Sequence, residues 1–172
     1  NGFKHPDTSA LSDGIRGLRV GVVRHFYEED PYLDDDVLDA MELSLSTFER
    51  LGARLSNVRL SDFDLYCSVA RKISWPEEYE EHRAELDAFP DRFTAVSRSR
   101  LEDGKAVSAA DYIQARKQQA ALMAELRETM QDVDVLVLPT IKKPAQVIGY
   151  EHTELGKLEL SLTRPFNLTG GP

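Results

Sequence analysis

The run Leu18-Arg19-Val20-Gly21-Val22-Val23 decides the fold, because a short and mostly apolar run is typical of a buried strand. A helix is predicted to begin at residues 34–36 and to end at Gly52, with apolar residues recurring every three or four positions. Residues 53–60 then alternate between apolar and polar side chains, as a second strand does. A crossover this short predicts a β-α-β unit whose parallel strands are joined in the right-handed sense.

A third strand is predicted at Asp134-Val135-Leu136-Val137-Leu138, whose nearly all-apolar composition is typical of a strand buried on both faces. Pro139 and Thr140 follow it directly. Because α/β sheets hold their ligands at the carboxyl ends of the strands, this is the one place inside the chain that looks built for a ligand. The same Pro-Thr pair also fits a plain strand terminator, and the sequence leaves both interpretations open.

Between the second and third strands the pattern is helical throughout. Pro76 and Pro90 are expected to interrupt it, and Gly104 is expected to stop a shorter helix. Ser108 is predicted to cap a long helix, with Asp111 three residues on in capping-box spacing. The expected helices cover residues 62–74, 77–88 and 92–101, and a long segment that begins at 108.

These elements predict an α/β fold, in which a mixed sheet has a β-α-β start and residues 62–131 form a helical insert. Residues 1–16 are interpreted as a linker or loop, because they contain Pro6, two glycines and several Ser, Asp and Thr residues. The chain begins without Met and ends in a Gly-rich run. Residues 1–172 are therefore expected to be a piece of a larger protein.

Composition excludes several classes of protein. The formal net charge is -9, and acidic residues concentrate between residues 28 and 39, so the chain lacks the basic face that a nucleic-acid partner requires. No apolar run approaches the roughly 18 residues of a membrane span. Cys67 is the single cysteine and lies in an apolar stretch, which favours a position in the core and a cytoplasmic location.

No residue of this chain is predicted to catalyse a reaction, and no metal or cofactor is expected. The four histidines are scattered singly, without the paired spacing of metal ligands. Gly-rich phosphate-binding motifs are missing from the sequence. Lys72 with Ser74 cannot act as a Ser-Lys catalytic pair, because two residues apart on a helix they point in different directions and nothing desolvates the lysine.

Several segments, taken together, resemble the amidase signature family of serine hydrolases. No segment is specific by itself, but their shared order and spacing extend over nearly all of the chain. The segments are Gly17-Leu18-Arg19-Val20-Gly21-Val22; Glu80, His82 and Arg83; Arg100-Leu101-Glu102-Asp103-Gly104; Asp111-Tyr112-Ile113-Gln114-Ala115; Asp132-Val133-Asp134-Val135-Leu136-Val137-Leu138-Pro139-Thr140; and Pro165-Phe166-Asn167-Leu168-Thr169-Gly170-Gly171-Pro172.

The resemblance implies a hydrolase of carboxylic amides that uses a serine nucleophile, a second serine in a cis peptide and a lysine base. These groups belong to a Gly/Ser-rich region that is not found among the 172 residues. Residues 1–172 would then be the C-terminal part of a single amidase domain. They would supply sheet and substrate-pocket wall, and alone the chain is expected to be inactive. For pocket lining in the complete enzyme, Thr140 and Ile141 are the best candidates, and Tyr112 is a weaker one because an aromatic residue at a helix start is more often core.

Two other functions stay open. The amidase-related subunit of tRNA-dependent amidotransferases shares the resemblance, although its Glu-Gly-Phe-Gly-type and Lys-Arg-Arg-rich stretch is replaced by Val-Ser-Arg-Ser-Arg-Leu at residues 96–101. A non-catalytic interaction domain could instead use the acidic helix to meet a basic partner. The expected partners are a small-molecule amide in the complete enzyme and, through exposed strand edges, a second copy in a homodimer.

Overall fold

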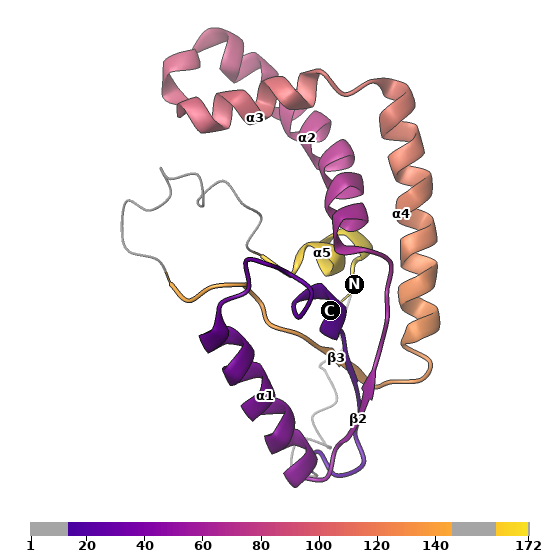
Figure 1. Cartoon of the computed structure of the whole chain (residues 1–172). Helices are drawn as coiled ribbons and strands as arrows, with labels where there is room; N and C mark the ends of the chain where they lie inside the picture. The colour runs from indigo at the N-terminus through magenta and orange to yellow at the C-terminus, as the bar shows by residue number, and fades with distance from the viewer. Residues whose placement is uncertain (1–13, 146–160, 172) are drawn as a thin grey trace, which may run out of the picture. The chain divides into compact units, whose positions relative to one another are not determined.

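The chain divides into two compact units, and the computed structural model describes residues 14–145 and 161–171. Two separate segments of the sequence build each unit, as the colours of Figure 1 show. The first unit is Asn1–Arg59 with Thr129–Leu162, and the second is Leu60–Glu128 with Thr163–Pro172. Most of the linker expected over residues 1–16 lies outside the described residues.

The first unit contains a three-stranded parallel sheet. Its strands are β1 (Arg19–Val22), β2 (Arg54–Asn57) and β3 (Val135–Val137), in the order β2-β1-β3. The register pairs Val20 with Leu55 on one side and with Val135 on the other. The predicted β-α-β unit with parallel strands is therefore confirmed, and so is the α/β fold class.

The centre of the sheet is β1, because it is hydrogen-bonded on both edges. Val20 and Val22 are almost completely buried. Between them, Gly21 allows a close approach that a side chain would prevent. A Cβ atom at Gly21 would lie 2.7 Å from side-chain atoms of both Leu136 and Val58. The glycine in the opening sequence run is thus needed for the side chains of Leu136 and Val58 to pack over β1.

Helix α1 (Asp35–Arg50) connects β1 to β2, and both of its ends follow the sequence prediction. The side chain of Asp34 accepts a hydrogen bond from the amide of Asp36 at 3.1 Å, which caps the first turn. Gly52 follows the helix with φ at 95°, a left-handed conformation that favours glycine. Met41 and Leu45 are buried on the inner face of the helix.

The prediction that the third strand is buried on both faces is wrong for the described part of the chain. Among the described strands, β3 pairs only with β1, so it forms an edge of the sheet. Val135 is 38% exposed, and Leu136 and Val137 are half-buried. The described residues therefore bury only part of the apolar surface of β3.

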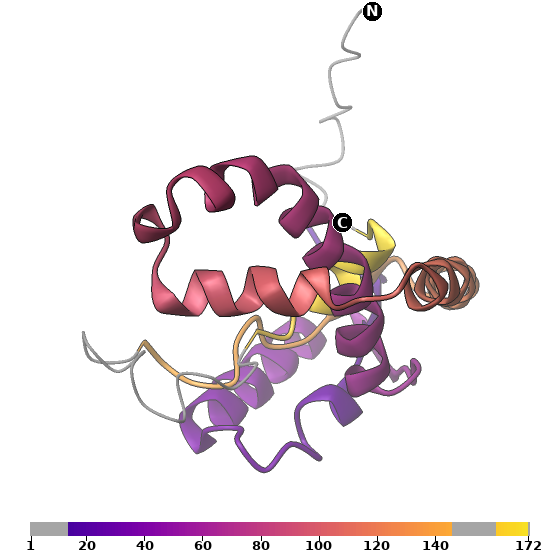
Figure 2. The same cartoon turned by 90° about the horizontal axis from the view of Figure 1, so that it is seen from above.

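The second unit is helical. Its main helices are α2 (Phe63–Ala88), α3 (Ala95–Lys105), α4 (Ala109–Thr129) and the short α5 (Arg164–Thr169). The predicted break at Pro76 is wrong, because α2 continues through this residue as one helix. Pro76 removes one helical hydrogen bond and bends the axis without ending the helix, and the bend is visible in Figure 2.

Helix α3 packs against the bend of α2 through Gly104. A Cβ atom at Gly104 would lie 2.2 Å from the carbonyl oxygen of Trp75, the residue before Pro76. The sequence interpretation placed a helix over residues 92–101 with Gly104 as its stop, which is wrong at both ends. The hydroxyl of Thr94 accepts a hydrogen bond from the amide of Ser97 and sets the start of α3, and Gly104 lies inside the helix.

Helix α4 begins as predicted. The amide of Asp111 donates a hydrogen bond to the Ser108 hydroxyl at 3.0 Å, and that hydroxyl in turn donates to the Asp111 carboxylate. Further along α4, the carboxylate of Glu125 accepts hydrogen bonds from the amide and hydroxyl of Ser61 and from the Tyr66 hydroxyl. The predicted core position of Cys67 is confirmed, since its side chain is buried in α2.

We predict that Gly104→Ala lowers the free energy of unfolding by about 1 to 3 kcal/mol, because the new methyl group overlaps the backbone of α2. In a freely exposed helix the same change would raise stability by about 1 kcal/mol. Urea denaturation measures the difference. Ser99→Ala, an exposed position of the same helix, is the matched control and should change stability by less than about 0.5 kcal/mol. A Gly104→Ala protein as stable as the parent would contradict this packing.

Candidate functional site

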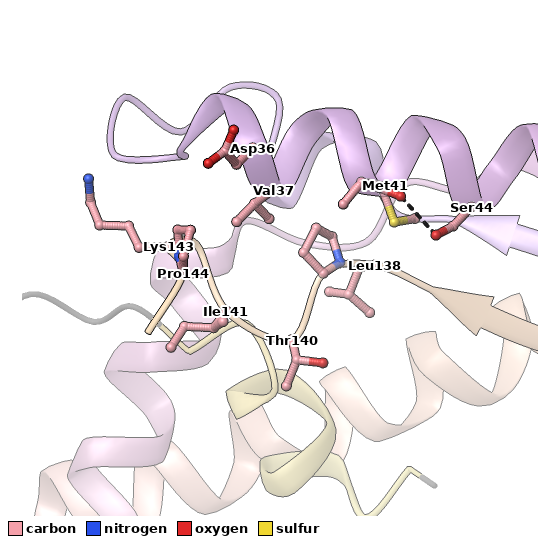
Figure 3. Close-up of a pocket in the computed structure, with 11 residues that line it drawn as sticks. Asp36, Val37, Met41, Ser44, Leu138, Thr140, Ile141, Lys143 and Pro144 are labelled. Carbon is pink, nitrogen blue, oxygen red and sulfur yellow. Dashed lines mark hydrogen bonds between the residues drawn. The ribbon is translucent and has the colours of Figure 1, made fainter. Parts of the chain in front are cut away.

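A groove of about 480 Å³ lies in the first unit, between α1 and the loop that follows β3. It therefore lies at the carboxyl end of a parallel strand, where the sequence predicted a ligand site. On the α1 side the lining comes from positions that share one face of the helix. The lining residues drawn and labelled in Figure 3 are Asp36, Val37, Met41 and Ser44 from α1, and Leu138, Thr140, Ile141, Lys143 and Pro144 from the loop.

Most of this lining is apolar. Val37 and Met41 extend from α1 towards the loop, and Leu138 and Ile141 approach from the opposite side (Figure 3). The hydroxyl of Ser44 donates a hydrogen bond to the Ala40 carbonyl at 2.8 Å, so it is used within the helix itself. The groove can therefore bind a molecule chiefly through apolar contact.

The backbone of the loop is held from both sides. The carbonyl oxygen of Thr140 accepts a hydrogen bond from the amide of Leu162 at 3.0 Å, and Ile141 forms an antiparallel bridge with Ser161. On the other side, the amide of Asp34 donates to the carbonyl oxygen of Lys142 at 2.9 Å. Since these bonds join parts of the chain itself, the wall that carries Thr140 and Ile141 is preorganised.

A buried ion pair also fixes this loop. The ammonium group of Lys142 lies 2.6 Å from the carboxylate of Asp30, and their side chains are only 7% and 15% exposed. Asp30 precedes α1, so the pair ties the loop to the segment that leads into the helix on the other side of the groove. Breaking such a pair is costly because one charge is left buried without a partner.

Arg24 contacts α1 near the middle of the helix. It follows β1, and its guanidinium contacts the carboxylates of Glu28 and Glu42 and the side chain of Asn57. Hydrogen bonds to Glu42 and Glu28 raise the pKa of Arg24 above its ordinary value. Because Glu42 belongs to α1 and Asn57 to β2, one side chain joins three elements of the unit.

Tyr112 does not line this groove. It belongs to α4 in the second unit, where its hydroxyl donates a hydrogen bond to the carboxylate of Glu77 at 2.7 Å. That bond, followed by burial, raises the pKa of Tyr112. The structure therefore brings Thr140 and Ile141 together in one wall and places Tyr112 elsewhere. A role for any of the three in substrate binding stays a prediction.

The side chains of the groove are suited to binding a molecule, not to reacting with it. Its lining offers hydroxyl groups, the carboxylate of Asp36 and one lysine, but Ser44 is bonded within α1 and Lys143 points away from the other side chains in Figure 3. Within residues 14–145 and 161–171, no group of three or more His, Cys, Asp or Glu side chains could hold a metal ion. No helix in these same segments is long and apolar enough to cross a membrane.

Comparison with known proteins decides the family. The family model described as Amidase matches residues 4–172. The chain belongs to the amidase family. This confirms the resemblance that the sequence motifs indicated.

Three similar proteins show how much of an amidase-family protein this chain covers. An amidase of Pseudomonas putida is 33% identical over 144 residues, which are 83% of this chain and 30% of the relative. A glutamyl-tRNA(Gln) amidotransferase subunit of Pelobacter propionicus is 29% identical over 188 residues, covering 94% of this chain and 38% of the relative. The crystal structure of an amidase matches with a TM-score of 0.77 at 27% identity, over 91% of this chain and 37% of that one.

Sequence reasoning missed the residues that shape the groove from behind the loop. Lys142 and Lys143 are adjacent lysines, and nothing in the sequence says that the first is buried and the second is not. Asp30 lies within the acidic run of residues 28–39, a pattern that is typical of a solvated loop. In the structure, Glu28, Glu29 and Asp30 each meet a basic side chain from another part of the first unit or from the same turn.

We predict that Asp30→Asn lowers the free energy of unfolding by about 3 kcal/mol, because it leaves the buried Lys142 ammonium without its counter-charge. Glu29→Gln is the matched control. Its partner Arg59 lies 3.6 Å away and both side chains are about two-thirds exposed, so the loss should stay below about 1 kcal/mol. Urea denaturation of the two variants checks this, and equal effects would show that burial of the Lys142 pair is unimportant.

Proposed function

We propose that this chain is part of an amidase that hydrolyses carboxylic amide C–N bonds, and that it supplies sheet and substrate-pocket wall. One observation carries the proposal: a preorganised groove at the carboxyl end of β3, in a chain that matches the amidase family from residue 4 to residue 172. The amidase of Pseudomonas putida supports the same activity. The chain spans less than two fifths of each of the curated relatives compared above.

The reactive groups would come from sequence beyond these 172 residues. The family resemblance implies a serine nucleophile, a second serine in a cis peptide and a lysine base. The lysine can accept the serine proton only when it is neutral, so it must be buried away from acids. A Gly-rich loop would donate backbone N–H groups to the oxyanion that forms during attack on the amide carbonyl. The groove described above would position the acyl part of the substrate for that attack.

The second candidate is the function of the tRNA-dependent amidotransferase component. It is supported by the Pelobacter propionicus relative, whose match extends over 94% of this chain. The two functions differ in substrate, since the amidotransferase would take its amide from glutamine. Hydrolysis of glutamine in preference to simple amides by the full-length protein would favour this second function.

We predict that the purified 172-residue chain does not hydrolyse amides, because the described groove holds no nucleophile with a base beside it. Ammonia release from acetamide, hexanamide and benzamide measures this. The full-length protein that contains the chain is the control and should release ammonia. Turnover that stays with the purified chain would overturn the assignment of the reactive groups to other sequence.

In the full-length protein, Thr140→Val is expected to change the ratio of kcat/KM between two amides by about fivefold, which is what losing one hydrogen bond of about 1 kcal/mol produces. Valine keeps the shape of threonine and removes only the hydroxyl group. Thr129→Val, at the end of α4 and outside the groove lining, is the matched control. An unchanged substrate profile for Thr140→Val would remove this residue from the pocket.

A further inference from the structure

We propose that the groove between α1 and residues 138–144 binds the apolar acyl part of an amide, an aliphatic chain or an aromatic ring, and selects against short and charged acyl groups. This inference rests on the proposed function and names the substrate class for the same site. It follows from the kinds of side chains on the two walls, from the exposure of one of them, and from where the charged groups lie.

Both walls are apolar where they face each other. Val37 and Met41 come from successive turns of α1, and Leu138 and Ile141 come from the loop after β3. A cavity of about 480 Å³ is of the size that holds a small organic molecule. Each methylene group buried between these walls should improve binding about fourfold.

Ile141 exposes apolar surface that a bound ligand would cover. Its side chain is 46% exposed although the backbone around it is hydrogen-bonded to Leu162 and Asp34. The position of the side chain is therefore set by the fold, and a bound apolar group would remove it from water. Met41 lies across the groove with a side chain that is almost buried, and its flexible thioether can adapt to chains of different shape.

Charged groups lie at the margin of the groove. Asp36 belongs to the first turn of α1, and Lys143 extends away from the apolar side chains (Figure 3). A charged acyl group in the groove would lose water against Val37 and Leu138 without gaining a partner of opposite charge there, which is unfavourable. An uncharged acyl chain does not pay this cost of desolvation. The groove therefore discriminates by desolvation as well as by size.

The experiment titrates the 172-residue chain, labelled with ¹³C at its methionine methyl groups, with hexanamide and with acetamide. The chain has three methionines, so Met41 reports on the groove, while Met123 in α4 and Met130 in the turn after α4, neither of which lines the groove, serve as internal references. Hexanamide should shift the Met41 signal saturably, with a dissociation constant at least about tenfold lower than that of acetamide. Equal affinities, or a response at Met123 or Met130 alone, would overturn the proposal.

Two variants test the walls. Val37→Asp should weaken hexanamide binding at least about tenfold, because it places a charge in the apolar wall. Leu43→Asp is the matched control on the same helix, since Leu43 is 68% exposed and does not line the groove. If Val37→Asp fails to fold, Ile141→Asp provides the same test at an already exposed position. Unchanged binding in a folded wall variant would overturn the proposal.

The same titration in the full-length protein separates this inference from the proposed function. A Met41 response to hexanamide without any amide hydrolysis would support the groove and overturn the function. Hydrolysis that favours acetamide over hexanamide would support the function and overturn the groove. If Met41 no longer responds in the full-length protein, another part of the polypeptide occupies the groove. That result also overturns the proposal.

Discussion

Hydrogen bonding of β1 on both edges is the constraint on which the first unit depends. The side chains of Leu136 and Val58 can pack over this strand only because Gly21 has no side chain of its own at that point. Once β1 is fixed in this way, the crossover through α1 and the path of β3 are fixed with it. Arg24 then joins the end of β1 to α1 and to β2. The groove forms because β3, which pairs with β1, ends beside α1, the helix that follows β1.

Binding in the groove benefits from a wall that is already ordered. The loop after β3 has its backbone bonded to Leu162 and to Asp34, and the buried pair of Lys142 with Asp30 holds it from behind. A ligand therefore does not have to order this segment, and the apolar contact it makes is not offset by that cost. In the proposed function, Lys142 would affect binding without touching the ligand, through the position it gives to Ile141.

Sequence reasoning succeeded where a local rule decides the structure. Neighbouring residues alone determine the helix caps at Asp34 and Ser108 and the left-handed conformation of Gly52. These helix ends could therefore be predicted from the sequence. It failed at Pro76 and Gly104, where contacts between distant segments override the local preference. The same limit applies to the candidate site. Thr140 and Ile141 were predicted from their place after a strand, whereas the opposite wall and the buried Lys142 depend on partners more than 90 residues away in sequence.

Cys67 can report on local opening of the second unit. It is the chain's single thiol, and its side chain lies in the core of α2 with only 3% of its surface accessible. A thiol reagent in water can react with it only when the helices around it separate. The rate of labelling therefore measures how often this part of the core opens, without any change to the sequence and without a signal from the first unit.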